Sequence, residues 1–228
     1  IGALGQAIGT SSLSIGTQGQ ALGASSIAIG TGNVVRGDRS GAIGDPSIIN
    51  GVDSYSIGNN NKIGSTTNNA FALGNNVYLG ADAAGNDTAL GVSGAVALGS
   101  DTSVTRGGGV ALGRGSVADT AGGVAGYDPS TGTATTKGDA TWTSTLAAVS
   151  VGSAGNTRQI TNVAAGTQDT DAVNVAQLQA AQTASKVKYF SVNSTGGGNE
   201  DNLGASGADA IAIGRDAAVA AAGARGIA

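Results

Sequence analysis

The sequence predicts an all-β fold of the parallel β-solenoid type, in which a short repeat winds into stacked coils. Three observations lead to this prediction. Glycine recurs every seven residues from Gly2 to Gly58, short stretches of alternating large and small apolar residues precede these glycines, and the composition combines 41 glycines with only 3% aromatic residues. Small apolar residues with abundant glycine indicate a thin, repetitive structure in which backbones approach closely.

The glycine row consists of Gly2, Gly9, Gly16, Gly23, Gly30, Gly37, Gly44, Gly51 and Gly58. A large aliphatic residue usually comes directly before the glycine, as at Ile29, with a small residue before that and another large residue two positions earlier. This period-two alternation is typical of strands. A coiled-coil heptad also has a period of seven, but one glycine per heptad would cost about 1 kcal/mol each relative to alanine. The helical interpretation is therefore rejected.

Two seven-residue units make one coil of fourteen residues, and the strongest motifs recur at that spacing, as in Ala28-Ile29-Gly30 and Ala42-Ile43-Gly44. We expect roughly eight coils, with a slip in register around residues 62–87. The large aliphatic side chains are expected to fill the coil interior: Ile8, Ile15, Leu22, Ile29, Ile43, Ile57, Leu98 and Leu112. The opposite strand face, rich in Ala and Ser, leaves room for another surface. Strands that are apolar on both faces are usually buried on both, which suggests that several chains pack together.

The stretch from about Arg114 to Asn156 departs from the repeat. Residues 124–127 and 133–136 flank Asp128-Pro129-Ser130-Thr131-Gly132 and predict a hairpin with a turn. The single tryptophan, Trp142, is expected to pack this insertion against the last coil rather than to anchor a receptor. Tyr127, beside the turn, is the better candidate for exposure.

From Arg158 the glycine repeat is replaced by a segment that is predicted to be extended and to end at Gly166. Thr170 or Asp171 then caps a predicted helix that begins at Asp171 or Ala172 and ends near Ser185. A helix of this length is not stable alone, so it needs partners, which a coiled coil would supply.

This segment closely resembles the neck of trimeric autotransporter adhesins, whose pattern is Ile-x-Asn-Val-Ala-x-Gly followed by Asp-Ala-Val-Asn-x-x-Gln-Leu. The matching residues are Ile160, Asn162, Val163, Ala164, Gly166, Asp171, Ala172, Val173, Asn174, Gln177 and Leu178. The resemblance implies that a trimer forms in the neck through Ile160, Asn162, Val163, Gly166, Asp171, Val173, Val175 and Leu178. It also implies that the glycine repeats form the family's head, a left-handed parallel β-roll built from three chains.

The resemblance divides the chain into four parts. Residues 1–115 are the head β-roll, residues 116–157 the head insertion and last coil, and residues 158–186 the neck and a short coiled coil. Residues 187–228 resemble the start of a second head, with the lead-in at residues 188–194 and first coils around Ala212-Ile213-Gly214.

The family resemblance also implies a function for this chain. It predicts a homotrimeric passenger on the surface of a Gram-negative bacterium that attaches to host cells, extracellular matrix proteins or other bacteria. Membrane attachment would come only from a C-terminal anchor that is absent from this sequence. An alternative is a structural spacer that displays a distal binding domain, and a trimeric phage fibre is a third interpretation. No residue is indicated as ligand-binding.

Catalysis is not expected. The sequence has no His and no Cys, which removes imidazole bases, thiol nucleophiles and most transition-metal sites. The carboxylate pairs Asp82 with Asp87, Asp169 with Asp171, and Glu200 with Asp201 fit turn or helix-start roles better than catalysis. The triple glycines at 107–109 and 196–198 lack the residues of a phosphate loop. No cofactor or metal is predicted, and the net charge of −4 argues against nucleic acid as a partner.

Overall fold

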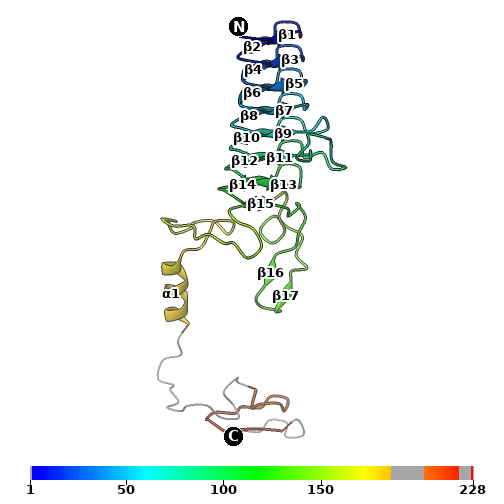
Figure 1. The fold of residues 1–228 in the computed structure, drawn as a ribbon. Coiled ribbons are helices and arrows are strands. Elements are labelled where there is room, and N and C mark those ends of the chain that lie inside the picture. The colour runs from blue at the N-terminus through cyan, green and yellow to red at the C-terminus, as the bar shows by residue number, and fades with distance from the viewer. Residues whose placement is uncertain (1, 186–202, 221–226, 228) are drawn as a thin grey trace. The chain divides into compact units, whose positions relative to one another are not determined.

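The computed structural model describes residues 2–185, 203–220 and 227, and it is shown in Figure 1. The chain divides into two compact units, Ile1–Asn162 and Val163–Ala228. Each unit is described by itself.

The first unit is a parallel β-solenoid with two eight-stranded sheets, and all neighbouring strands within each sheet are parallel (Figure 1). Sheet A contains β1 (Gln6–Ala7), β3 (Gln20–Ala21), β5 (Val34–Val35), β7 (Ile48–Ile49), β9 (Lys62–Ile63), β11 (Tyr78–Leu79), β13 (Ser103–Val104) and β15 (Val117–Ala118). Sheet B contains β2 (Leu13–Ile15), β4 (Ile27–Gly30), β6 (Gly41–Gly44), β8 (Tyr55–Ile57), β10 (Phe71–Leu73), β12 (Val96–Leu98), β14 (Val110–Leu112) and β18 (Val149–Ser150). The predicted all-β solenoid of about eight turns is confirmed.

The register explains the period of the sequence. Leu13 pairs with Ile27, and Ile27 pairs with Gly41, so each early coil takes fourteen residues. Farther along, Phe71 pairs with Val96 and Val110 pairs with Val149. The additional residues of these longer coils leave the sheets as loops, and the strands return to the same register.

The coil interior is thin and is filled unequally by the two sheets. Sheet A contributes large buried side chains: Val35, Ile49, Ile63, Leu79 and Val104. Sheet B contributes small ones: Ala28, Ala42, Ser56, Ala72, Ala97 and Ala111. One large and one small side chain together fill the space between the sheets at the density of a protein interior.

The predicted set of interior residues is therefore wrong. None of Ile8, Ile15, Leu22, Ile29, Ile43, Ile57, Leu98 and Leu112 is buried within the chain. Six of them, Ile15, Ile29, Ile43, Ile57, Leu98 and Leu112, lie in sheet B, where the small residue before each points inward and the large residue lies on the outer face because successive side chains alternate. Ile8 and Leu22 follow the sheet A strands β1 and β3. The interior lacks room for a second large column opposite the isoleucines and valines of sheet A.

The recurring glycines allow the coils to stack closely at the end of each sheet B strand. A Cβ added at Gly30 would lie 1.8 Å from the carbonyl oxygen of Gly44, and one at Gly44 would lie 2.0 Å from that of Gly58. These two glycines also have φ values of +117° and +134°, which other residues rarely adopt. Glycine is thus required at this corner for both space and backbone conformation.

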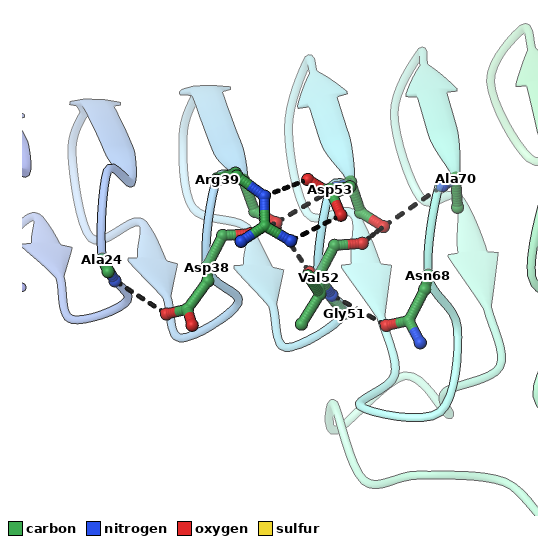
Figure 2. Close-up of polar contacts among 10 residues, drawn as sticks. Ala24, Asp38, Arg39, Gly51, Val52, Asp53, Asn68 and Ala70 are labelled. Atoms are coloured by element: carbon green, nitrogen blue, oxygen red, sulfur yellow. Dashed lines mark hydrogen bonds and ion pairs between the residues drawn. The ribbon is translucent and has the colours of Figure 1, made fainter.

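Side chains at the turns bond to the backbone of the neighbouring coil (Figure 2). The Asp38 carboxylate accepts a hydrogen bond from the Ala24 amide at 2.7 Å, and the Asn68 side chain accepts one from the Val52 amide at 2.9 Å. Arg39 and Asp53, one coil apart, form a two-pronged ion pair at 2.6 and 2.8 Å. The bonds of Asp38 and Asn68 satisfy backbone amides that the short strands leave unpaired, whereas the ion pair joins two side chains.

The insertion contains a hairpin at the predicted turn, but its first strand begins three residues later than predicted and includes Asp128, and its second strand ends two residues earlier. β16 (Tyr127–Asp128) pairs antiparallel with β17 (Thr133–Ala134). The Lys137 amine lies 3.8 Å from the centre of the half-buried Trp142 ring and 3.4 Å from the Asp128 carboxylate. Lys137 therefore links the hairpin to the segment that returns to the solenoid at β18.

The second unit contains α1 (Val175–Ala184), so the helix begins three or four residues later than predicted. Among residues 203–220 and 227, isolated parallel bridges join Ala205 to Val219 and Ile211 to Ile227. The predicted lead-in at residues 188–194 lies outside the described residues.

Candidate assembly surfaces

The outer face of sheet B carries two continuous apolar columns. The first consists of Leu13, Ile27, Gly41, Tyr55, Phe71, Val96, Val110 and Val149, which pair in register from coil to coil. The second consists of Ile15, Ile29, Ile43, Ile57, Leu73, Leu98 and Leu112. We call these two columns together the aliphatic face. Its exposed members include Ile43 at 45%, Ile57 at 41% and Leu112 at 45%.

Gly41 is the one small residue in the first column, and an aromatic ring fills its place. A Cβ at Gly41 would lie 2.8 Å from Cδ1 of Tyr55, so the tyrosine ring covers the glycine. The aliphatic face is therefore continuous along the solenoid. Contiguous apolar surface of this extent marks an interaction site in soluble proteins.

In the second unit, the start of α1 is fixed by a reciprocal capping box. The Asn174 side chain accepts a hydrogen bond from the Gln177 amide at 3.0 Å, and the Gln177 side chain accepts one from the Asn174 amide at 3.3 Å. Asn174, rather than Thr170 or Asp171, is thus the N-cap. The Asn-x-x-Gln spacing is the sequence signal that could have located the helix start.

Gln177 and Asn174 also hold the extended piece that precedes the helix. Gln177 accepts a hydrogen bond from the Gly166 amide and donates one to the Gly166 carbonyl, both at 3.0 Å. Asn174 donates to the Val163 carbonyl at 3.2 Å. The chain therefore folds back on the first turn of its own helix.

Asp171 closes the loop between these two parts. Its carboxylate accepts hydrogen bonds from the amides of Thr167 at 2.8 Å and Gln168 at 3.0 Å. These bonds to the charged form lower the pKa of Asp171 below its ordinary value. A Cβ at Gly166 would lie 2.7 Å from Cβ of Asp171, so this position of the loop has no space for a larger residue.

The structure places the eight predicted neck residues in both units. Ile160 and Asn162 belong to the first unit, and the second contains Val163, Gly166, Asp171, Val173, Val175 and Leu178. The hydrogen bonds bring Val163, Gly166 and Asp171 into one loop around Asn174 and Gln177. Val173, Val175 and Leu178 are exposed to solvent within the single chain, at 69%, 70% and 65%, respectively. No residue of α1 is buried.

Asp82, Asp87 and Asp171, which were considered for catalysis, have structural partners. Asp82 accepts hydrogen bonds from the amides of Ala84 and Asn86, and Asp87 accepts one from the Ser65 amide. Glu200 and Asp201 lie outside the described residues. Within the described part of the chain, no group of three or more His, Cys, Asp or Glu residues is placed to hold a metal ion.

Hollows also lie on the surface of the first unit. An open one of about 670 Å³ lies beside the last coil, where residues 117–120, 148–154 and 156–158 line it. A smaller one of about 340 Å³ lies between β13 and the loop that follows β11.

Burial lowers the pKa of the Lys62 amine. The aliphatic part of the Lys62 side chain lies near Gly85, in the loop that follows β11.

These features define a repeat protein of the parallel β-solenoid class, joined to a loop-and-helix segment with a tightly bonded start. Residues 159–201 match the family described as the coiled stalk of trimeric autotransporter adhesin. A stretch of 57 residues is 58% identical to the autotransporter adhesin BadA of Bartonella henselae. The two matches support the resemblance to trimeric autotransporter adhesins that the sequence indicates.

The matched stretch covers 24% of this chain and 2% of the Bartonella protein, so the chain spans a small part of that relative. Among the described residues, α1 is too short to cross a membrane, and the structure offers no longer apolar helix there.

Proposed function

We propose that this chain is part of a homotrimeric surface fibre that attaches a Gram-negative bacterium to host cells, extracellular matrix proteins or other bacteria. The observation that carries the proposal is the aliphatic face, which runs the length of sheet B and is not covered within the chain. Catalysis plays no part in this function. The fibre would be held in the outer membrane by a part of the protein outside this sequence.

The aliphatic face favours a self-complementary assembly. Three copies whose sheets B face a common axis would bury the isoleucines and leucines of all three chains in one dry interior. Burial of each such side chain contributes about 1.5–3 kcal/mol, and the columns repeat the contribution at every coil. The left-handed winding of the roll that the family resemblance implies remains a prediction.

The neck supports the same assembly. A ten-residue helix is marginal alone in water, and α1 has no buried residue within its own chain. A parallel coiled coil would cover Val175 and Leu178, which lie three residues apart on one face of the helix. We accordingly assign residues 1–115 to the roll, 116–157 to the insertion and last coil, 158–186 to the neck and 187–228 to the start of a second roll.

Attachment is assigned to the outside of the fibre. The insertion exposes Tyr127 at 68% and Val124 at 50%, a surface that the regular coils do not provide. The regular coils by themselves would serve equally well as a spacer, and this is the competing function.

The test has two parts. Light scattering over a dilution series, with circular dichroism on the same samples, should give a β-rich trimer that persists on dilution. The trimer is then tested for binding to surfaces coated with matrix proteins and to cultured cells, beside a variant in which residues 127–134 are replaced by a short glycine-serine turn. Binding that the variant loses supports attachment through the insertion. A trimer that binds none of these surfaces supports the spacer, and a folded monomer would overturn the assembly.

A further inference from the structure

The corner glycines of sheet B form a stack that ends in an arginine side chain. Each glycine faces the backbone of the corner glycine one coil later, from Gly16 through Gly30, Gly44, Gly58, Gly74 and Gly99 to Gly113. At Gly113, the guanidinium of Arg158 lies where the backbone of the next corner glycine would be. A Cβ added at Gly113 would lie 3.3 Å from Cζ of Arg158 and 3.4 Å from its Nε.

The same guanidinium donates to three acceptors of the last coil. Nη2 donates to the Arg114 carbonyl at 2.5 Å, and Nη1 donates to the Ser116 hydroxyl at 3.1 Å and to the Val151 carbonyl. Ser116 is fully buried, and its hydroxyl donates in turn to the Leu112 carbonyl at 2.8 Å. Arg158 is thus bonded to both arms of the coil, the one that follows β14 and the one that follows β18.

In the earlier coils the backbone of the next coil supplies the equivalent bonds. The amides of Gly58, Gly74, Gly99 and Gly113 donate to the carbonyls of Ile43, Ile57, Leu73 and Leu98, respectively. A solenoid that ends needs other partners for the polar groups of its last coil, because unpaired backbone groups cost free energy and an open end pairs with other chains. A planar guanidinium has five N–H donors, so it can supply the hydrogen bonds that the backbone of a further coil would otherwise donate.

We propose that Arg158 is the terminal cap of the solenoid. Its guanidinium replaces the next coil at the glycine corner, satisfies the last coil and holds the exit point of the chain. The segment that matches the coiled-stalk family begins at residue 159, directly after this residue. Arg158 therefore fixes the place where the roll ends and the stalk segment begins, and this role does not depend on how many chains assemble.

The cap is tested by amide hydrogen exchange on the full chain, comparing Arg158→Gln and Arg158→Lys with the parent. Arg106→Gln is the matched control, because the Arg106 guanidinium donates only to the adjacent Thr105 carbonyl among the bonds of the described residues. The reporters are the amides of Gly113, which donates to Leu98, and Val117, which donates to Gly152. Gly58, in the middle of the solenoid, serves as the reference.

We expect Arg158→Gln to speed exchange at Gly113 and Val117 roughly tenfold, with Gly58 and the Arg106→Gln protein unchanged. Arg158→Lys should restore the protection only in part, because an ammonium is a point charge without the planar fork. Equal protection in the parent and Arg158→Gln proteins would overturn the cap, as would full restoration by lysine or an equal increase at Gly58. The mass of each variant, measured on the same samples, separates loss of the cap from loss of the proposed trimer.

Discussion

At the scale of single residues, the corner glycines and the aspartate of the neck loop show how backbone geometry sets side-chain identity. Gly44 has both a positive φ and a neighbouring carbonyl within reach of any Cβ, whereas Asp171 is held by amides that favour its charged form. Each feature leads to a measurable effect.

Substitution of Gly44 by alanine should destabilise the solenoid strongly. Its φ of +134° and the 2.0 Å approach of the added Cβ to the Gly58 carbonyl oxygen both oppose the change. We expect a loss of at least about 3 kcal/mol in the free energy of unfolding, measured by chemical denaturation. Gly108→Ala is the matched control, since Gly108 has a φ of +72° but no atom within 4 Å of the added Cβ. Similar losses at both positions would show that coil stacking does not require the glycine.

The neck loop should loosen in acid. The pKa of Asp171 is lowered in the folded state by its bonds from the Thr167 and Gln168 amides, so its contribution to stability is complete above the unfolded value of about 3.9. That contribution is lost as the pH falls through the lower folded pKa. Carbon-detected NMR of the Asp171 carboxyl should therefore titrate with a midpoint below about 3.9. A midpoint at or above that value would contradict the hydrogen-bonded loop.

At the scale of elements, adjacent residues of β6 separate folding from assembly. Ala42 is fully buried in the coil, whereas Ile43 is 45% exposed on the aliphatic face. Ala42→Asp should unfold the coils around it, because an unpaired buried charge costs several kcal/mol. Ile43→Asp should keep the β-sheet signal in circular dichroism and lower the mass in light scattering.

The two β6 variants are also controls for each other, since they place the same charge one residue apart. If Ile43→Asp lost its β structure as completely as Ala42→Asp, the aliphatic face would belong to the interior after all. If neither variant changed the mass, the proposed interface would lie elsewhere.

The start of α1 depends on its capping box. Asn174→Ala should cost about 1 kcal/mol of helix stability, because the Gln177 amide loses its acceptor. The effect should appear as lower helix content in circular dichroism and as a lower unfolding midpoint for the neck. Gln179→Ala, at an exposed position two residues after Gln177, should leave both quantities unchanged. An Asn174→Ala protein with parental helix content would remove Asn174 from the cap.

At the scale of the whole molecule, the sequence predicted the architecture but not which strand face is inside. The fourteen-residue spacing of motifs such as Ala28-Ile29-Gly30 corresponds directly to the strand register. The alternation assigns Ala28 and Ile29 to opposite faces of the strand, but it does not say which of the two faces lies in the interior. The choice depends on the facing column of Val35, Ile49 and Ile63 in the other sheet, whose volume the local pattern does not contain.

The neck shows a similar division. Its resemblance to a family located the segment, but residue patterns placed the helix start at Asp171 or Ala172 instead of Val175. Acidic residues are common caps, and this preference outweighed the Asn174–Gln177 spacing. The role of Arg158 depends on contacts with Val151, seven residues away, and with Arg114, 44 residues away. No local sequence pattern could have indicated contacts at these separations.

Assembly of the whole molecule should depend on Leu178. In a three-stranded neck, Leu178→Asp would place three unpaired charges near one axis, at a cost of several kcal/mol per ion. The variant should dissociate at concentrations where the parent is trimeric, as measured by light scattering. Gln179→Asp, which adds the same charge at the next exposed position, should keep its mass. A Leu178→Asp protein of unchanged mass would refute the coiled-coil assignment.

The parallel register of the solenoid has a mechanical consequence. Hydrogen bonds between neighbouring strands point along the direction in which the coils stack, so a pull in that direction stretches the coils in series. The weakest coil then yields first. β18 contributes two residues to its pairing with β14, against three between β12 and β14. Detachment of β18 would free the insertion between β15 and β18 to extend, and the solenoid would lengthen under force before its other coils separate.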